Sequence, residues 1–573
     1  MATSIPVNER LTAKQVKEGG VHYTPPELAQ FLASHVAAHL PDEQSQPRLL
    51  DPACGDGELL EALAVQMPAQ LRSRSTFFGM ESDPIAIQHA TKRLRSLPDV
   101  RFELIETDFL SWTTDFQQPQ MFAPDAWHQP FDAVISNPPY VRTQVMGGGN
   151  AQKLATQFGI TGRVDLYHAF ALAMTLVLRE GGVLGLLCSN RFLSVQSGAT
   201  LRKVLLQDYA LHDIFDLGDT KLFGAAVLPA IVIGTKAAPS KSECRFTRIY
   251  ENRDLKNKAT SFPTVLKAID SGADGAIQVN DRVFLVERGR LAAPANLSEP
   301  WRVSSPEQDA WLANLKCRAP RTFADLVNIR VGVKTTADNV FIRDDWSELP
   351  KQMQPEPEVL FPLVSNWAAE QWWPLNTGRQ VQILYTHTLK NGKRVPIDLE
   401  QFPRAANYLE SQRAQLEGRK YVIEAGRRWY EIWVPQQPSE WPKPKAVFPD
   451  ISPTPKFFLD ETGSIVDGNC YWFTAQEREH LYLLLAIANS TFILKFYDMI
   501  CGNKLYAGRR RFITQYVERF PVPDPDSAAA ERVIAKMRAL YSLAPHSEDA
   551  KTVISEVDSL VWDACSLVEK IAG

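Results

Sequence analysis

Short apolar runs alternate with longer amphipathic stretches through the first 240 residues, and this alternation restricts the fold more than any other feature. Apolar runs of about four to eight residues predict strands, and apolar residues at helical spacing predict the helices between them. Regular strand–helix alternation is typical of a parallel sheet with helices on both faces, which carries its ligand at the carboxyl ends of the strands. The predicted strands are Arg48–Asp51, Thr76–Glu81, Phe102–Thr107, Ala133–Ser136, Val183–Cys188, Leu211–Asp216 and Ala230–Gly234. The clearest predicted helices are Glu58–Gln66, Pro84–Arg95 and Leu166–Leu178.

The pattern changes near residue 240, where Pro and Trp become frequent and the alternation ends. A chain of 573 residues is too long for one ordinary core, so two or three domains are expected. We predict an α/β domain at 1–240 with a doubly wound, seven-stranded sheet. An α+β domain is expected at 241–524 and a helical segment at 525–573, with a break near residues 545–547.

Composition excludes several classes of protein. The formal net charge of −4 argues against a wholly basic nucleic-acid binder, although a local basic face would still allow DNA binding. The seven cysteines are scattered without a Cys-x-x-Cys pair, so no zinc site or disulfide framework is predicted and the cytoplasm is the expected location. The first residues lack a signal-peptide pattern, and the most apolar stretch, 481–496, is interrupted by polar residues and predicts a buried helix. Neither a metal nor a membrane is expected.

The first predicted strand runs into the glycine-containing segment Asp51-Pro52-Ala53-Cys54-Gly55-Asp56-Gly57. Glycines let the backbone approach a ligand closely, and the start of the following helix offers free N–H groups. The segment lacks the Lys-Ser/Thr ending of a phosphate loop and the three-glycine spacing of a dinucleotide site. An ordinary strand–helix turn is the alternative interpretation.

Acidic residues also end the second and third predicted strands. Glu81 can accept hydrogen bonds from both hydroxyls of a ribose, while Asp83 is expected to cap the helix that begins at Pro84. Asp108 can accept from an adenine amino group, and Phe109 can pack on its ring. A single acidic strand end is usually only a helix cap, whereas three of them in consecutive strand–helix units predict a nucleoside site.

The fourth predicted strand ends in Asn137-Pro138-Pro139-Tyr140. Two prolines fix the backbone and remove two N–H donors, so the Asn137 side-chain oxygen and the Pro138 carbonyl can both point outward as acceptors. Two acceptors facing an aryl amine bind its hydrogens and draw its lone pair out of conjugation, which prepares the nitrogen to attack an electrophilic methyl group. Tyr140 offers a flat face for stacking a base. A rigid loop without chemistry is the alternative.

These motifs together resemble the amino-methyltransferases among class I S-adenosylmethionine enzymes. The upstream segment His22-Tyr23-Thr24-Pro25-Pro26 narrows the resemblance to the γ group of DNA N6-adenine methyltransferases, the TaqI-type enzymes. The resemblance implies a catalytic domain followed by a target-recognition domain. It also implies that Phe223 stacks on the face of a flipped adenine opposite Tyr140, although a core phenylalanine is the alternative. The implied cofactor-binding residues are Tyr23, Thr24, Asp51, Ala53, Cys54, Gly55, Glu81, Ser82, Asp108, Phe109, Asn137 and Pro139.

The second half of the chain resembles the family more loosely, through Val331–Thr335, Asn339–Phe341, Arg428–Glu431, Glu518–Pro523 and Glu556–Val561. Basic residues interleaved with aromatic ones suit contact with phosphates and sugars, although a charge run is more often a solvated face. The predicted DNA-binding residues are Arg427, Arg428, Lys504, Arg509, Arg510 and Arg511.

The sequence thus predicts a site-specific methyltransferase that acts on N6 of adenine in double-stranded DNA. Cytosine N4, RNA adenine and protein glutamine remain alternative acceptors, and a recognition subunit without turnover is a further alternative. A fused nuclease domain is not expected, because only about 20 residues precede the first cofactor motif. A separately encoded restriction endonuclease is therefore a possible partner.

Overall fold

The computed structural model describes residues 23–41, 46–116, 126–140, 148–160, 165–222, 228–237, 243–252, 255, 259–292, 299–501 and 509–566. Packing divides the chain into two compact units, the first extending to Ser305 and the second beginning at Pro306. The functional boundaries that we predict at residues 240 and 524 differ from this packing boundary, and they stay predictions.

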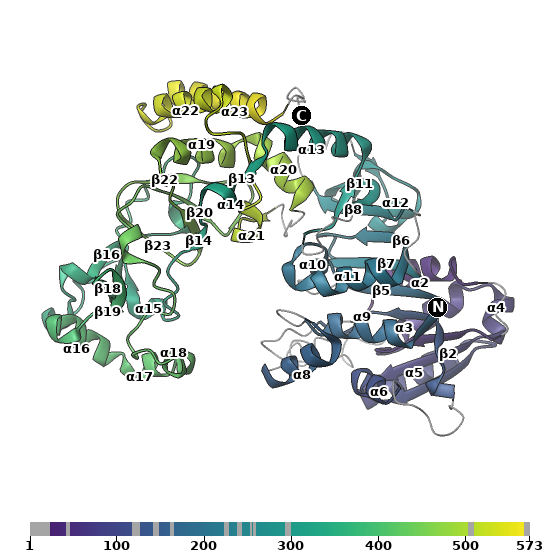
Figure 1. Cartoon of the computed structure of the whole chain (residues 1–573). Coiled ribbons are helices and arrows are strands. Elements are labelled where there is room, and N and C mark those ends of the chain that lie inside the picture. Colours follow the sequence, from purple (N-terminus) through teal and green to yellow (C-terminus); the bar gives the residue numbers. More distant parts are fainter. Residues whose placement is uncertain are drawn as a thin grey trace. The chain divides into compact units, whose positions relative to one another are not determined.

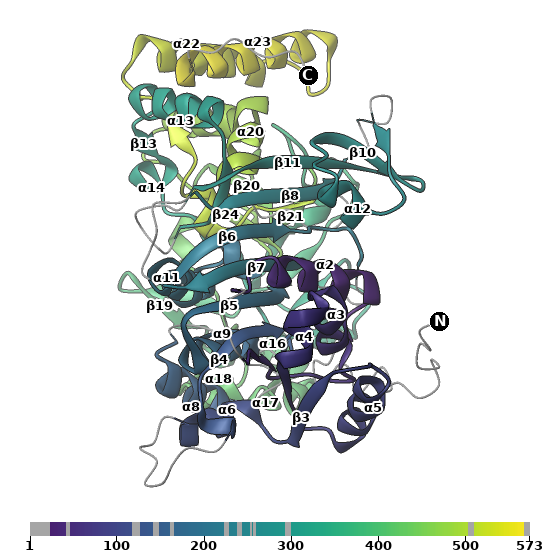
Figure 2. The ribbon, with the colours of Figure 1, turned by 90° about the vertical axis from the view of Figure 1, so that its right-hand side faces the viewer.

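The first unit is built on a twelve-stranded sheet within the described residues (Figures 1 and 2). Its order is β3-β2-β1-β4-β5-β7-β6-β8-β11-β10-β9, with β12 paired to β11. β7 runs antiparallel to both of its neighbours, whereas β1 to β5 are parallel. The first seven strands have these bounds: β1 Arg48–Asp51, β2 Thr76–Glu81, β3 Arg101–Glu106, β4 Phe131–Ser136, β5 Leu178–Ser189, β6 Tyr209–Asp216 and β7 Pro229–Lys236. The remaining strands are β8 Arg245–Glu251, β9 Thr260–Ser261, β10 Gly275–Val279, β11 Arg282–Ala292 and β12 Arg302–Ser304.

All seven predicted strands are present and adjacent, so the predicted doubly wound α/β fold is confirmed. The sheet continues beyond them because β8 pairs with β6, and β11 pairs with β8 in turn. The expected change of texture at residue 240 therefore does not end the sheet. Enrichment in Pro and Trp indicates irregular connections. The strands between these connections still pair with the edge of the sheet.

Helices bury both faces of this sheet, which explains the near-continuous apolar runs of its strands. Leu49 and Leu50 show the alternation, since they are both buried but belong to different core clusters. Leu49 packs with α2 Pro26–Ala37, α3 Glu58–Gln66, α4 Ala69–Arg74, α5 Pro84–Arg95 and α12 Val265–Asp270. Leu50 packs with α6 Phe109–Phe116, α8 Gly148–Phe158, α9 Leu166–Val177, α10 Arg191–Ser194 and α11 Ala199–Asp208.

The second unit combines short strands with helices, as expected for an α+β domain. Its larger sheets are β14-β24-β20-β22 and β15-β17-β16-β23, and three two-stranded pairs accompany them, β13-β26, β18-β19 and β21-β25. The strands are β13 Arg321–Thr322, β14 Arg330–Val331, β15 Ile342–Arg343, β16 Leu360–Val364, β17 Gln382–Leu384, β18 His387–Lys390, β19 Lys393–Pro396, β20 Lys445–Pro449, β21 Ile451–Ser452, β22 Phe458–Asp460, β23 Ile465–Val466, β24 Cys470–Phe473, β25 Arg510–Arg511 and β26 Pro521–Val522. The helices are α13 Pro306–Arg318, α14 Phe323–Leu326, α15 Asp338–Phe341, α16 Pro403–Ser411, α17 Arg413–Glu417, α18 Lys420–Glu424, α19 Arg478–Asn489, α20 Thr491–Ile500, α21 Thr514–Val517, α22 Ala528–Tyr541 and α23 Glu548–Cys565.

The helical end of the chain follows the predicted pattern. α22 and α23 are separated near Pro545, and each begins with a serine whose side chain accepts a hydrogen bond from the first turn. The apolar stretch at 481–496 is buried as predicted, but Ser490 splits it into α19 and α20 by capping the second helix. Within the described ranges, no single helix has the length and apolarity needed to span a membrane, and α19 with α20 meets these criteria only as a pair bent by 66°.

Candidate active site

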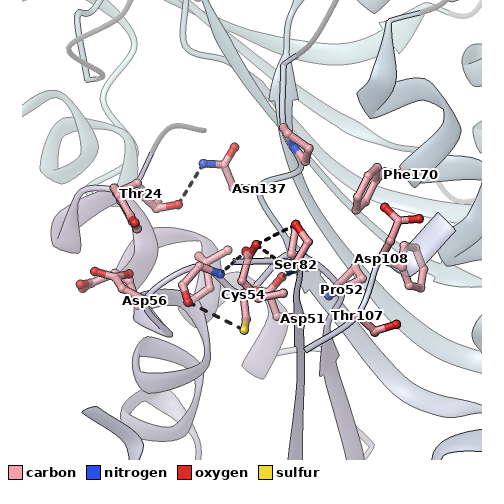
Figure 3. A pocket seen from close by; sticks show the side chains of 18 of the residues that line it. Thr24, Asp51, Pro52, Cys54, Asp56, Ser82, Thr107, Asp108, Asn137 and Phe170 are labelled. Carbon is pink, nitrogen blue, oxygen red and sulfur yellow. Dashed lines mark hydrogen bonds between the residues drawn. The ribbon is translucent and has the colours of Figure 1, made fainter. Parts of the chain in front are cut away.

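A cavity of about 230 Å³ opens at the carboxyl ends of the first strands (Figure 3). β1 lies between β2 and β4 in the sheet, so the residues that follow these parallel strands meet at one edge. All of the predicted cofactor-binding residues line the cavity: Tyr23, Thr24, Asp51, Ala53, Cys54, Gly55, Glu81, Ser82, Asp108, Phe109, Asn137 and Pro139. The sequence thus located the walls of the cavity, whereas the binding roles of these residues stay predictions.

Several lining residues were not predicted. Leu166 and Phe170 reach the cavity from the first turns of α9, a wall that no motif marks because apolar residues on a buried helix look like ordinary core. Pro52, Asp56, Glu58, Leu59 and Thr107 also line it. Each of these five is within a few positions of a predicted residue, so closeness to the motif is the signal that could have found them.

The glycine segment closes tightly between β1 and α3. Gly55 and Gly57 have φ angles of 51° and 84°, and Gly57 is the residue that precedes α3. A Cβ atom at Gly57 would lie 3.2 Å from the Cα of Ala90 in α5, so the position requires glycine for packing as well as for conformation. These constraints hold the Ala53 and Gly55 backbone at the wall of the cavity.

Asp51 is almost fully buried at the base of the cavity. Its Oδ1 accepts a hydrogen bond from the Ala53 N–H at 3.1 Å, and its Oδ2 has no hydrogen-bond partner in the described chain. Burial raises the pKa of this carboxyl group to about 7, and repulsion from Glu81 adds to the increase. The nearby Ser136 hydroxyl lowers the pKa, without meeting hydrogen-bond geometry in the structure. The arrangement favours a cation beside Asp51.

Glu81 ties the second strand to the glycine segment. One carboxylate oxygen accepts from the Gly55 N–H at 3.1 Å, and the other accepts from the N–H groups of Ser82 at 2.7 Å and Asp83 at 3.0 Å. The predicted cap is confirmed, since the Asp83 side chain accepts from the Ile85 N–H at 2.9 Å. Glu81 is therefore held in a fixed orientation at the cavity wall.

Asp108 and Phe109 follow β3 in the same way. Asp108 Oδ1 accepts from the Ser111 N–H at 2.7 Å, so the residue caps the start of α6 as well as lining the cavity. The Phe109 ring is buried against the Phe170 ring, with centroids 5.5 Å apart. The helix-cap interpretation and the predicted ligand role are thus compatible, because the residue presents its side chain at the edge where the strands end.

Both polar atoms of the Asn137 side-chain amide form hydrogen bonds. Its Nδ2 donates to Thr24 Oγ1 at 3.0 Å, a contact that joins the segment before α2 to the end of β4 (Figure 3). Its Oδ1 accepts a hydrogen bond of 2.6 Å from the Tyr140 hydroxyl, and burial raises the pKa of Tyr140, which keeps this hydroxyl protonated. The Tyr140 ring packs edge-on against Tyr167, with centroids 6.2 Å apart. The sequence predicted Asn137 as an acceptor but not the Tyr140 hydrogen bond, because the loop geometry sets it.

Two further predicted catalytic residues are Pro138 and Phe223. Pro138 is buried directly after β4 and does not line the cavity. Phe223 lies outside the described residues, so its predicted stacking role stays a prediction.

The predicted DNA-binding arginines have contrasting surroundings. Arg510 is largely buried and pairs with Asp498 at 2.6 Å, and Arg511 pairs with Asp450 at 2.7 Å, so part of this basic run stabilises the second unit. Arg509 and Arg428 are exposed, whereas Arg427 packs over the Trp433 ring at 4.7 Å. Lys504 lies outside the described residues. Exposure therefore favours Arg428 and Arg509 over Arg510 as phosphate contacts.

The described residues contain no group of three or more His, Cys, Asp or Glu side chains arranged to hold a metal ion. Acidic groups at three strand ends, a tight glycine turn and an amide held in orientation match the arrangement that the sequence motifs predicted.

Comparisons with known proteins agree with this arrangement. Residues 74–223 match the family described as Eco57I restriction-modification methylase, and residues 388–522 match the TaqI-like C-terminal specificity domain. The type II methyltransferase M.BanIII of Aneurinibacillus aneurinilyticus is 40% identical over 566 residues, which cover 96% of this chain and 97% of the relative. The type II methyltransferase M.BstVI of Geobacillus stearothermophilus is 26% identical, with coverage of 93% and 96%.

Two solved structures resemble the whole fold at low sequence identity. A nuclease-deletion mutant of the type ISP restriction-modification enzyme LlaGI has a TM-score of 0.53 and 11% identity, and covers 91% of this chain and 47% of its own. DrdV in its DNA complex has a TM-score of 0.50 and 12% identity, with coverage of 93% and 59%. These likenesses concern the fold alone. The near-complete match to M.BanIII and the two family matches show that the chain belongs to the TaqI-like restriction-modification methyltransferases.

Proposed function

We propose that the chain transfers a methyl group from S-adenosylmethionine to N6 of adenine in double-stranded DNA. Its family makes it a DNA methyltransferase of restriction-modification, and the base and the atom are the proposed part. The observation that carries the proposal is the Asn137 amide, which lies at the cavity wall and is held from both sides by Thr24 and Tyr140.

The cavity residues fit S-adenosylmethionine, which when bound supplies an electrophilic methyl group. The buried Asp51 Oδ2 atom, which has no partner in the described chain, would hold the amine of the methionine part. Glu81 would accept from the ribose hydroxyls, and Asp108 from the adenine amino group with Phe109 against the ring. The same proposal gives Tyr23, Thr24, Ala53, Cys54, Gly55, Ser82 and Pro139 contacts with the cofactor.

The proposed task of Asn137 is to accept a hydrogen bond from the amine that becomes methylated. An amide oxygen has two lone pairs, so Oδ1 can keep the Tyr140 hydroxyl on one and offer the other to the substrate amine. Thr24 takes the Nδ2 donor and thereby prevents the amide from turning its NH₂ group towards the substrate. With the Pro138 carbonyl as a second acceptor, the amine lone pair leaves conjugation. The preorganised acceptors would supply most of the acceleration.

We propose further that the target adenine is flipped out of the duplex and stacks between Tyr140 and Phe223. Tyr167 supports this role, because it packs against the Tyr140 ring and limits its rotation. Residues 1–240 would carry catalysis, residues 241–524 would recognise the DNA target, and residues 525–573 would form the closing helical segment. Arg427, Arg428, Lys504, Arg509 and Arg511 would contribute to DNA contact.

Cytosine N4 is the second candidate acceptor, because its amine presents the same chemistry to Asn137. A family match to a DNA specificity domain over 388–522 does not favour protein glutamine or RNA as substrates. A separately encoded restriction endonuclease is the proposed partner, and the cytoplasm is the proposed location.

Methyl transfer by an Asn137→Ala variant tests this function. We expect labelled methyl transfer to duplex DNA at saturating cofactor to fall by at least about 100-fold, because the lost group contacts the reacting amine. Gln88→Ala removes an exposed amide side chain on α5 that does not line the cavity, so it is the matched control and should keep full activity. Near-normal transfer by Asn137→Ala would show that the acceptor role is assigned to the wrong residue.

A further inference from the structure

The two strands β18 and β19 form a hairpin that pairs with no other described strand (Figure 1). Lys390 pairs with Lys393 across the turn, and Asn391 and Gly392 connect them with φ angles of 53° and 72°. Two consecutive positive φ angles in a two-residue loop are typical of a type I′ turn, which suits the twist of the strands. The hairpin is therefore a well-defined ribbon and not an irregular loop.

The base of the hairpin is fixed while its tip is exposed. His387 is buried and lies 3.3 Å from a carboxylate oxygen of Glu431, measured from Nε2. The carbonyl of Ile397, just after β19, accepts a hydrogen bond of 2.8 Å from the buried Tyr430 hydroxyl. In contrast, residues 388–394 are all exposed to solvent. The ribbon thus projects from a rigid support formed by the segment at 430–431.

The two lysine charges on this ribbon have no structural use within the described residues. Lys390 and Lys393 lie directly opposite each other and share one face, and neither ammonium group has an ion pair or hydrogen bond there. Like charges directly opposite in an antiparallel pair destabilise it. Arg394 lies on the other face of the ribbon and donates to the Gln436 carbonyl at 2.9 Å. It is a cation, so it does not reduce the repulsion between the two lysines. An anion bound between the two lysines would attract both and offset this repulsion.

The same support carries a predicted DNA-binding residue. Glu431 accepts from the Arg428 N–H at 2.8 Å through one oxygen and faces His387 through the other. The exposed Arg428 side chain therefore belongs to the surface that holds the hairpin. The match to the TaqI-like C-terminal specificity domain begins at residue 388, so the hairpin lies at the start of the matched region.

We propose that the β18–β19 hairpin enters the major groove of duplex DNA. Lys390 and Lys393 contact backbone phosphates, and Asn391 at the tip faces base edges. The major groove of B-form DNA admits a two-stranded ribbon, and an asparagine amide can donate to and accept from one base. The deep, narrow major groove of duplex RNA does not admit such a ribbon. This inference rests on the proposed function, since it needs duplex DNA as the substrate.

The salt dependence of DNA binding tests the lysine contacts. The experiment compares the full chain with a Lys390→Gln/Lys393→Gln variant. The probe is a fluorescent, unmethylated duplex that contains the sequence found to be methylated by the full chain. The slope of log affinity against log salt concentration should fall by about 2, because each phosphate contact contributes about 0.9 to it. Thermal stability should stay equal or rise, since the repulsion between the lysines is removed. Lys92→Gln/Lys551→Gln is the matched control, because both lysines are exposed and lie outside residues 241–524.

An Asn391→Gly variant tests the base contact separately. Glycine keeps the positive φ angle of the turn and removes only the side chain, so the fold of the hairpin is preserved. We expect an unchanged salt slope together with methylation at additional, near-cognate sequences in a map of modified bases. An unchanged set of methylated sequences would refute the base contact.

Three results separate failure of this inference from failure of the proposed function. An unaltered salt slope in the lysine variant, with methylation of duplex DNA intact in the unsubstituted chain, would overturn the hairpin proposal alone. It would instead favour lysines that only block strand addition at an exposed edge. A slope change with duplex RNA but not with duplex DNA would refute the assignment to DNA. Absence of methylation of duplex DNA by the unsubstituted chain would refute the proposed function itself.

Discussion

The buried carboxyl group of Asp51 should make cofactor binding depend on pH near neutrality. Its pKa is raised to about 7 by burial, so the group is mostly protonated at pH 5.5 and mostly ionised at pH 7.5. A cationic amine needs the ionised form. The ionised fraction rises about 25-fold between these two values, and cofactor affinity should rise by the same factor, which is about 2 kcal/mol.

The assay is calorimetric titration with S-adenosylhomocysteine, which carries the same amine without a transferable methyl group. Titrations at pH 5.5, 6.5 and 7.5 stay below the range where a free α-amino group loses its own proton, near pH 8. An Asp51→Asn variant should bind more weakly at pH 7.5 and lose most of the pH dependence. Glu58 also lines the cavity with a pKa raised mainly by burial, so any dependence left in that variant is attributed to Glu58.

The same shift predicts how the cofactor changes stability. Because burial raises the folded-state pKa of Asp51 above its ordinary value of 3.8, its contribution to stability is full below pH 3.8 and is lost as the pH rises towards 7. A shift of this size corresponds to a cost of up to about 4 kcal/mol at neutral pH. A bound cation offsets that cost, so the cofactor should raise the melting temperature more at pH 7.5 than at pH 5.5. Equal affinities at both pH values, or a pH dependence unchanged in Asp51→Asn, would refute the reasoning.

The other predictions concern the amide of Asn137 and the arginine run. Tyr140→Phe keeps the ring but removes a hydrogen bond worth about 1 kcal/mol, so kcat should fall about 5-fold with little change in KM for DNA; an unchanged kcat would contradict the role of the hydroxyl. Thr24→Val should lower kcat more than Thr24→Ser, which keeps the acceptor for Asn137, and equal effects would argue against amide orientation. Arg510→Ala removes the ion pair with Asp498 and should lower the free energy of unfolding in urea by about 1–3 kcal/mol, with cofactor affinity unchanged. A stable Arg510→Ala variant with weakened DNA binding would restore the DNA-contact role.

The fold of the first seven strands could be predicted because most of them, unlike the partly exposed edge strand β3, are buried on both faces. Continuous apolar runs then stand out from their flanking helices, as β1 at Arg48–Asp51 and α5 at Pro84–Arg95 show, where predicted and observed bounds coincide. The start of one strand differs from the prediction: β5 begins at Leu178, earlier than its apolar core at Val183, because Leu178 already pairs with Phe131 of β4 before a register irregularity that spans the polar and glycine residues.

The strands beyond residue 240 could not be predicted in the same way. β11 at Arg282–Ala292 mixes charged and apolar residues, because its outer part is only half-buried. Its membership of the main sheet follows from pairing with β8, which is a long-range contact that local sequence does not encode. Periodicity shows that a strand exists, but it does not show which sheet the strand joins.

In the candidate site, too, the positions set by strand topology could be predicted, whereas the contacts set by side-chain packing could not. Residues such as Asp51 and Glu81 were predictable because topology alone brings the ends of neighbouring parallel strands together. The hydrogen bond from Tyr140 to Asn137 and the ion pair of Arg510 with Asp498 depend on rotamers and packing, and no motif reports these. A run of arginines looks identical in sequence whether its charges face solvent or a carboxylate.

Mass spectrometry of nucleosides from duplex DNA identifies both the base and the atom that the chain methylates. DNA of mixed sequence is incubated with S-adenosylmethionine and either the unsubstituted chain or Asn137→Ala, and the digested nucleosides are quantified. We expect the unsubstituted chain to form N6-methyladenine. The Asn137→Ala variant should form N6-methyladenine at least about 100-fold more slowly. N4-methylcytosine as the product, or N6-methyladenine formed equally fast by Asn137→Ala, would contradict these expectations.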